Sequence, residues 1–244
     1  MTPRLGSVPY RNVAPLVHGL DPAPRGMVPA ALAEALRAGE FDAALVPIAE
    51  YLAYPDSYAL VDDVAVASRG EVYSVILIPE PGVKLEGIRR VVLDPSSRTS
   101  VLLTRVLLEV RSGLNVSYVA PGTRADAHVL IGDPAIAFRE ACPDRPVLDL
   151  GKLWFDWTGL PFVFAAWVAR KEAATRELGD FLRQVKKGGL MARPSLSRNP
   201  FEERYFTDYI RYDLGDAEKA GILRFAGYLR EMGLLPAVPD IHWI

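Results

Sequence analysis

Two similar units of alternating helix and strand constrain the fold of this chain more than any other feature of its sequence. In the first unit, apolar residues recur at helical spacing after Pro29, Gly39 ends the predicted helix, and the apolar run 43–46 predicts a buried strand. The second unit contains a predicted helix at 101–110 and predicted strands at 91–93, 116–119 and 127–131. The repetition predicts an α/β protein with two lobes of similar design.

Two longer apolar segments, Val72 to Ile78 and Phe162 to Val168, lie before and after the second unit. A chain that leaves one lobe and later returns must cross between the lobes twice, and we expect these segments to be the two crossing strands. The first lobe is then residues 1–78 plus 164–244, and the second is residues 79–163, with a ligand cleft between them. Predicted C-terminal helices over 172–187, 199–211 and 216–232 would buttress the first lobe.

Composition excludes several classes of function. The formal net charge of −2 lacks the basic excess that is typical of nucleic-acid binding. The longest apolar stretch, 160–169, is about half as long as a bilayer-spanning helix, and Met1 to Ser7 has no signal-peptide pattern. The single cysteine, Cys142, cannot form an intrachain disulfide. We therefore expect a cytoplasmic protein with no nucleic-acid or membrane partner, and the choice between monomer and homodimer stays open.

The loop at residues 94–100 is the strongest candidate for a binding site. Ligands of open α/β sheets bind beyond the carboxyl ends of the strands. Here several hydroxyls and a guanidinium crowd a predicted helix N-terminus, where free N–H groups and the helix dipole favour an anion. Arg98 is expected to grip a carboxylate, with Ser96, Ser97 and Thr99 beside it. The alternative is ordinary N-capping by Ser96 or Ser97.

Other strand exits contribute weaker candidates. Ser7 and Asn12 follow the opening strand and offer either hydrogen bonds to a ligand or a helix cap. Gly132 and Asp133 follow the strand at 127–131, and Asp133 either caps the next helix or faces the ligand. Glu50 is expected to be a solvated surface residue rather than a base.

The sequence favours no metal site and no hydrolase. Its histidines, His18, His128 and His242, lack metal-ligand spacing, and no nucleophile elbow, Walker motif or paired-glycine dinucleotide fingerprint is present. We expect no metal and no organic cofactor. Ser74, on the first crossing strand, either faces the cleft or hydrogen-bonds within the sheet.

Several motifs along nearly the whole chain resemble those of one known family. They lie within residues 6–16, 42–51, 93–100, 130–135, 148–154 and 158–165. The family is the chorismate dehydratase of the futalosine route to menaquinone. The sequence departs from its pattern at His18, where we expect a tyrosine or a similar residue.

The resemblance implies the fold of type II periplasmic solute-binding proteins, used as an enzyme. It also implies a dianionic substrate, chorismate, which loses water to give 3-[(1-carboxyvinyl)oxy]benzoate. On this hypothesis Asn12 and Ser74 are the predicted catalytic residues. The predicted substrate-binding residues are Ser7, Ser96, Ser97, Arg98, Thr99, Gly132 and Asp133.

Two alternatives stay open. The sister enzyme that makes 1,4-dihydroxy-6-naphthoate shares the implied fold, but its opening motif differs and it relies on a histidine that we cannot place in this sequence. A non-catalytic small-anion-binding protein is the other alternative, against which we count the missing signal peptide and lipidation cysteine.

Overall fold

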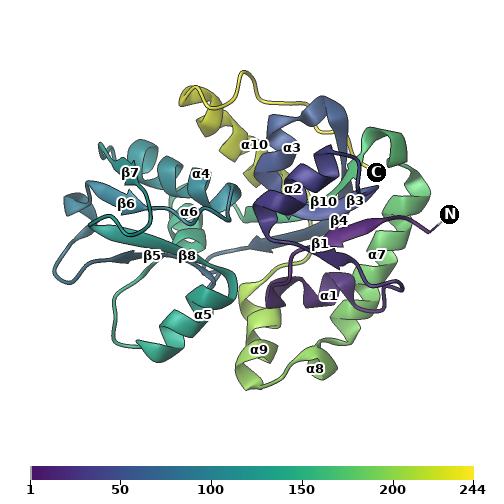
Figure 1. The fold of residues 1–244 in the computed structure, drawn as a ribbon, viewed down its shortest axis with the longest axis horizontal. Coiled ribbons are helices and arrows are strands. Elements are labelled where there is room, and N and C mark those ends of the chain that lie inside the picture. Colours follow the sequence, from purple (N-terminus) through teal and green to yellow (C-terminus); the bar gives the residue numbers. More distant parts are fainter. Residues whose placement is uncertain (1) are drawn as a thin grey trace.

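The computed structural model describes residues 2–244, which form two lobes, each built on a five-stranded sheet. Figure 1 shows the lobes side by side, with the second lobe on the left and both chain ends at the first lobe. The sheet of the first lobe has the order β2–β1–β3–β10–β4. Its strands are β1 (Leu5–Ser7), β2 (Arg25–Gly26), β3 (Ala43–Pro47), β4 (Tyr58–Ser68) and β10 (Phe162–Arg170).

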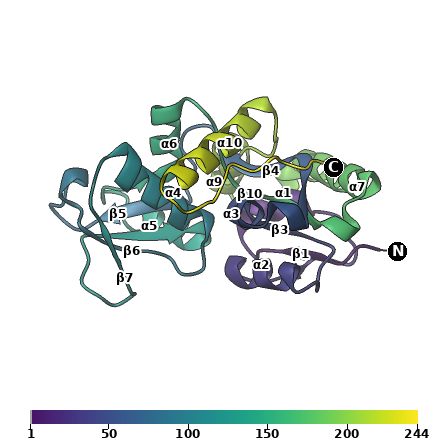
Figure 2. The same ribbon diagram turned by 90° about the horizontal axis from the view of Figure 1, so that it is seen from above.

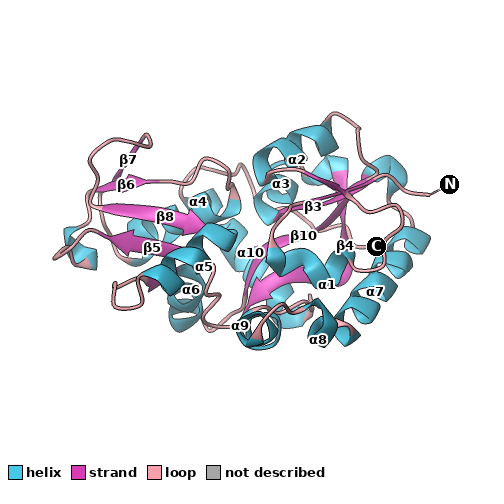
Figure 3. Ribbon diagram, turned by 60° about the horizontal axis from the view of Figure 1, so that its bottom comes forward, coloured by secondary structure: helices cyan, strands magenta, loops and turns pink. Residues whose placement is uncertain are grey.

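The second sheet has the order β7–β6–β8–β5–β9. Its strands are β5 (Val75–Pro79), β6 (Arg90–Val92), β7 (Ser117–Val119), β8 (Ala127–Ile131) and β9 (Leu148–Asp149). Each sheet contains one antiparallel strand that follows a crossing between the lobes. In the first sheet this strand is β10, which pairs with β3, and in the second it is β5, which pairs with β8. Figure 3 shows the two sheets as separate groups of strands.

Helices cover both sheets. Those of the second lobe are α4 (Thr99–Arg105), its π-helical continuation η4 (Val106–Arg111), α5 (Gly132–Ala141) and α6 (Leu150–Thr158). Those of the first lobe are η1 (Arg11–Val13), α1 (Ala14–Val17), α2 (Pro29–Arg37), α3 (Ile48–Ala53), α7 (Arg176–Met191), α8 (Arg193–Leu196), α9 (Pro200–Arg204), the π-helical η6 (Tyr205–Tyr209) and α10 (Asp216–Glu231). Short 3-10 turns lie at Pro55–Ser57, Leu85–Gly87 and Lys171–Ala173. Among residues 2–244, no helix combines the length and apolar character that crossing a bilayer requires.

The sheets divide the chain at slightly different points from the predicted ones. Strand β5, placed by the sequence at the end of the first lobe, pairs with β8 and β9 in the second sheet. Its apolar run is long because all five of its residues are buried within that sheet. Strand β10 lies wholly in the first sheet from Phe162 onward. The crossings are therefore made by the irregular segment 69–74 and by residues 150–161, which include α6.

Asp149 ties these two crossings together. Its carboxylate accepts hydrogen bonds from the backbone N–H groups of Val72 at 3.0 Å and Tyr73 at 2.8 Å, and from that of Lys152 at 3.0 Å. The next glycine allows the close approach, because a Cβ on Gly151 would lie 2.6 Å from Oγ of Ser68. The two connections between the lobes thus meet at one buried carboxylate.

Other helices and strands differ from expectation for identifiable reasons. The predicted end of a helix at Gly188-Gly189 is wrong, since α7 continues to Met191. A Cβ on Gly189 would lie 1.7 Å from the carbonyl oxygen of Pro15, so glycine is needed there for close packing against α1. The predicted cap at Asn199 is confirmed, because its side chain accepts the N–H of Glu202. Strand β4 was not predicted, although it pairs with β10 along most of its length.

Helix α10 joins the lobes from outside the sheets. It packs against β10 of the first sheet and against η4 of the second lobe, and Figure 2 shows it lying over the junction of the two lobes. Trp154 of α6 contacts Phe225 of α10 with ring centroids 6.0 Å apart, and Phe162 of β10 at 5.2 Å. The aromatic residues of α10 therefore pack in the core, as their helical spacing predicts.

Candidate active site

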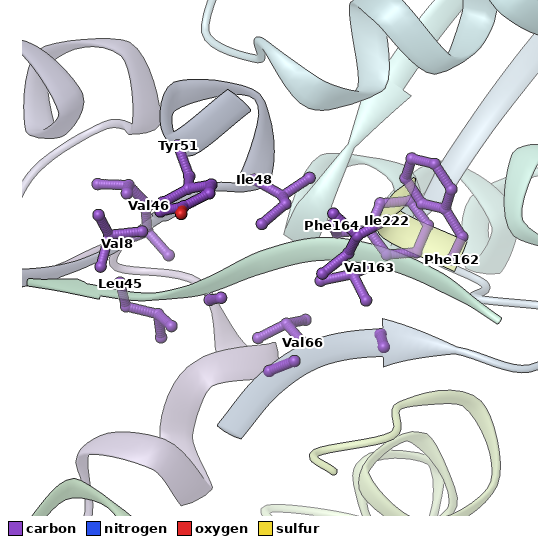
Figure 4. Packing of buried hydrophobic residues seen from close by; sticks show 14 of the residues in the cluster. Val8, Leu45, Val46, Ile48, Tyr51, Val66, Phe162, Val163, Phe164 and Ile222 are labelled. Carbon is purple, nitrogen blue, oxygen red and sulfur yellow. The ribbon is translucent and has the colours of Figure 1, made fainter. Parts of the chain in front are cut away.

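A cavity lies between the lobes, lined by residues of both. Its walls come from the strand exits of both lobes and from the first crossing. Most of the lining is apolar. Val8, Leu45, Val66 and Phe164, seen in Figure 4, belong both to this lining and to the core of the first lobe. The cavity floor is therefore as rigidly packed as the sheet beneath it.

Polar groups reach the cavity from both lobes. They belong to Tyr10, Asn12, Ser74, Ser97, Thr99 and Ser100. Within residues 2–244, the lining contains no Asp, Glu, Lys, Arg or His side chain. Any charge on a ligand would have to be met there by hydroxyls, an amide and the backbone.

Three of the lining hydroxyls already accept a hydrogen bond from the protein. Oγ1 of Thr99 accepts the N–H of Ala49 at 3.1 Å, which links the lobes. Oγ of Ser97 accepts the N–H of Ser100 at 3.1 Å, a contact within the first turn of the α4 region. Oγ of Ser74 accepts from the hydroxyl of Tyr205 at 2.7 Å. Ser97 and Thr99 each keep one hydroxyl proton to donate, and the Ser74 proton has the carbonyl of Val72 as a distant acceptor at 3.5 Å. The arrangement therefore favours a ligand rich in acceptors.

Asn12 contributes the complementary group. Its Oδ1 is buried and has no hydrogen-bond partner among the described residues, while its backbone carbonyl accepts from the hydroxyl of Tyr212 at 2.9 Å. A buried acceptor without a donor is costly in a folded protein. A ligand hydroxyl is the group that would satisfy this oxygen.

Gly132 and Tyr10 meet across the cleft. Gly132 has a φ of +61°, and a Cβ there would lie 3.2 Å from Cδ1 of Tyr10. The N–H of Gly132 donates to the carbonyl of Ser74 at 2.7 Å. Burial raises the pKa of Tyr10 above its ordinary value, so its phenol stays protonated. Glycine at this position allows the Tyr10 ring to close one side of the cavity.

Arg98 lies elsewhere than the sequence predicts. Its guanidinium donates to Oε2 of Glu50 at 2.9 Å and lies outside the cavity lining. Glu50 is fully buried rather than solvated, and it also accepts from the hydroxyl of Tyr58 at 3.1 Å and pairs with Arg37 at 3.4 Å. Arg98 thus forms an ion pair across the cleft, because a buried carboxylate must be neutralised.

Three other predicted residues also face the protein instead of the cavity. Oγ of Ser96 donates to Asp94 at 2.6 Å, and Oγ of Ser7 donates to the carbonyl of Val8 at 3.3 Å. Oδ1 of Asp133 accepts the N–H of Arg11 at 3.3 Å, which is another link between the lobes. The structure therefore brings together Asn12, Ser74, Ser97, Thr99 and Gly132 of the predicted set.

Sequence reasoning missed three contributors. Tyr10 and Ser100 line the cavity, and both lie inside motifs that were singled out, so their place in a strand exit was the available signal. Tyr205 supports Ser74 from 131 residues away, which no local pattern could reveal. No cluster of three or more His, Cys, Asp or Glu side chains suited to a metal occurs among residues 2–244.

Comparison with known proteins adds to this geometry. A sequence profile described as menaquinone biosynthesis matches residues 3–231. This chain belongs to the menaquinone biosynthesis family. The chain is also similar to the chorismate dehydratase of Thermus thermophilus, with 34% identity over 254 aligned residues that cover 91% of this chain and 93% of the relative. The family resemblance drawn from the motifs is thereby confirmed.

Solved structures confirm the predicted fold. A structural-genomics protein from Archaeoglobus fulgidus matches this menaquinone-family chain with a TM-score of 0.71 and 16% identity, covering 96% of this chain and 98% of the other. The periplasmic aliphatic sulphonate binding protein of Escherichia coli matches with a TM-score of 0.63 and 17% identity, covering 98% and 94%. These likenesses show the two-lobed periplasmic-binding-protein fold alone.

Proposed function

We propose that this protein is a chorismate dehydratase, a hydro-lyase that converts chorismate to 3-[(1-carboxyvinyl)oxy]benzoate and water. The observation that carries the proposal is the interlobe cavity, in which apolar walls surround hydroxyl protons and one unpartnered amide oxygen. Chorismate presents a flat carbon ring, two carboxylates and one hydroxyl. The similarity to a chorismate dehydratase over 91% of the chain supports the same substrate.

Each kind of group in the cavity lining matches one part of the substrate. Carboxylates accept hydrogen bonds, and the hydroxyls of Ser97 and Thr99 have protons to donate. The C4 hydroxyl of chorismate is a donor and suits Oδ1 of Asn12. The apolar lining, including Leu45 and Phe164, suits the ring.

The chemistry is an elimination that makes an aromatic ring. The C3–H bond breaks, its electron pair forms the C3–C4 double bond, and the C4–O bond breaks to release the hydroxyl, which leaves as water with the proton from C3. The ring carboxylate delocalises the negative charge that develops at C3 through the adjacent double bond. Aromatisation drives the step forward.

The substrate supplies the base in this mechanism. Among residues 2–244, the cavity lining contains no carboxylate, imidazole or amine side chain that could act as a base. The enolpyruvyl carboxylate of chorismate lies near C3 in a folded conformer and takes the proton. The protein contributes by fixing that conformer, which replaces a random search by a positioned reaction and disfavours the competing rearrangement of chorismate. Asn12 and Ser74 then orient the reacting groups.

Closure of the lobes completes the site. Ala49 with Thr99, Glu50 with Arg98, and Arg11 with Asp133 make polar contacts from one lobe to the other. These contacts hold the lobes together around the cavity, where a lower local dielectric constant strengthens each hydrogen bond to the substrate. A cytoplasmic location stays a prediction.

The test is turnover of chorismate by the purified protein. We expect the ultraviolet absorbance of the aromatic product to rise, and mass spectrometry to show the loss of one water. Calorimetry on the same sample measures binding independently. Tight binding of chorismate without product would favour a small-anion-binding protein instead. If chorismate is not bound and no product forms, chorismate is excluded as the substrate. No histidine of the described chain lines the cavity, so no observation favours the naphthoate synthase.

A further inference from the structure

The hydrogen bond between Tyr205 and Ser74 joins the C-terminal helices to the first crossing. Tyr205 opens the π-helical turn η6, and π-helical turns occur frequently at functional sites. Its side chain is fully buried, and its ring stacks on that of Phe201 with centroids 5.9 Å apart. The phenol does not line the cavity, whereas Ser74 does. The recorded hydrogen bond from the Tyr205 hydroxyl to a cavity-lining residue is the one to Ser74.

The direction of this hydrogen bond follows from the burial of the phenol. Within residues 2–244, Oγ of Ser74 is the one hydrogen-bond partner recorded for the Tyr205 hydroxyl, at 2.7 Å. If Ser74 donated, the phenol proton would be buried without an acceptor, which costs a full desolvation penalty. Burial also raises the pKa of Tyr205, so the phenol keeps its proton. Tyr205 donates and Ser74 accepts.

The consequence is an assigned direction for the Ser74 proton. With one lone pair of Oγ engaged by Tyr205, the Ser74 hydroxyl can donate either to the carbonyl of Val72, at a long 3.5 Å, or into the cavity. The backbone of Ser74 is held separately, because its carbonyl accepts the N–H of Gly132 at 2.7 Å. Rotation of the hydroxyl is the remaining freedom, and Tyr205 restricts it.

We propose that Tyr205 is a positioning residue that commits the Ser74 proton to the substrate and strengthens it as a donor. A hydroxyl that accepts a hydrogen bond becomes a better donor, because successive hydrogen bonds polarise one another. The role rests on the proposed dehydratase function. In that reaction the Ser74 proton stabilises oxygen that gains negative charge as the C4–O bond breaks.

A double-mutant cycle on chorismate turnover tests the role. Tyr205→Phe keeps the ring packing and removes the hydroxyl, and we expect kcat to fall about tenfold with KM changed less than twofold, a loss of about 1.4 kcal/mol of transition-state stabilisation. Ser74→Ala should lower kcat by at least as much. Because Tyr205 acts through Ser74, the variant with both changes should have the kcat of Ser74→Ala alone.

The matched control is Tyr209→Phe, which removes a phenol from the same turn. Tyr209 contacts Tyr73, with centroids 5.1 Å apart, and does not reach Ser74. We expect wild-type kcat and KM from this variant. Tyr205→Phe by itself is not essential to the test, because the double variant leaves no buried phenol unpaired. If Tyr205→Phe does not fold, equal kcat values in Ser74→Ala and the double variant still show that Tyr205 acts through Ser74.

Different outcomes refute different statements. A wild-type protein that makes no product refutes the dehydratase function and, with it, this role. The role of Tyr205 is refuted, and the dehydratase function is not, if the wild type turns over chorismate and either of two results is found. The first is a kcat loss in the double variant equal to the product of the two single losses, and the second is an unchanged kcat in Tyr205→Phe.

Discussion

Asn12 shows how one side chain can be read from its hydrogen bonds. Its backbone carbonyl is held by Tyr212, so the position of the residue is fixed by the protein, while its Oδ1 has no hydrogen-bond partner among the described residues. Ser97 and Thr99 show the opposite case, in which the oxygen is held by the protein and the proton is left. An acceptor beside several donors fits a ligand that has one hydroxyl and two carboxylates.

Substitution of Asn12 tests this assignment at the level of one oxygen atom. We expect Asn12→Ala to lower kcat on chorismate at least tenfold, because it removes a group worth about 1.4 kcal/mol to the transition state. Asn12→Asp should mainly raise KM, since a carboxylate would repel the dianion. Steady-state kinetics measures both effects. Unchanged turnover in Asn12→Ala would remove Asn12 from the mechanism.

Helices α3 and α4 face one another across the cleft and carry the clearest link between the lobes. Glu50 of α3 is fully buried and pairs with Arg37 of its own lobe and with Arg98 at the start of α4. The N–H of Ala49 and Oγ1 of Thr99 form the neighbouring contact. Arg98 therefore stabilises the approach of the two helices and, through it, the position of Thr99.

Two arginines on the same carboxylate provide a controlled comparison. Arg98→Gln and Arg37→Gln each leave Glu50 with one arginine, and we expect each to lower stability by about 1–3 kcal/mol. Only Arg98 crosses the cleft, so Arg98→Gln should raise KM for chorismate about tenfold, whereas Arg37→Gln should leave KM near the wild-type value. Thermal unfolding and steady-state kinetics check the two effects. Equal KM values in both variants would contradict the link across the lobes.

Both ends of the chain build the first lobe. Arg11 follows β1, and its guanidinium donates to Glu202 of α9 at 3.0 and 3.1 Å. Arg198 also donates to Glu202, and the side chain of Glu202 is 6% exposed. Burial by itself would raise the pKa of Glu202, but the hydrogen bonds from Arg198 and Arg11 lower it to about 2. This carboxylate fastens the N-terminal segment to the C-terminal helices.

Acid should weaken this attachment in a defined pH range. The pKa of Glu202 is about 2 in the folded protein and 4.5 when unperturbed. Its contribution to stability, about 3 kcal/mol, is therefore complete above pH 4.5 and is lost as the pH falls toward 2. Urea unfolding from pH 7 to 2 should show the stability difference between wild type and Glu202→Gln shrinking over that interval. The exposed neighbour supplies the control, Glu203→Gln. A difference that does not vary with pH would contradict the assignment.

Several features of the fold could be predicted because they depend on nearby residues. Helical spacing after Pro29 and the turn at Gly39, where φ is +82°, predicted α2 and β3. The polar exits of parallel strands predicted that Asn12, Ser97, Thr99 and Gly132 would meet, because those strand ends lie at one edge of each sheet. Repetition of the units predicted the two lobes.

The sequence by itself determined these units, the loops that line the cavity and the family to which the chain belongs. Only the tertiary structure decided which partner each polar side chain finds. Arg98 carries the same guanidinium whether it meets a ligand or Glu50, and Ser74 is separated from Tyr205 by 131 positions. Local patterns report what a side chain can bond to, whereas packing of distant segments selects the bond that burial makes necessary.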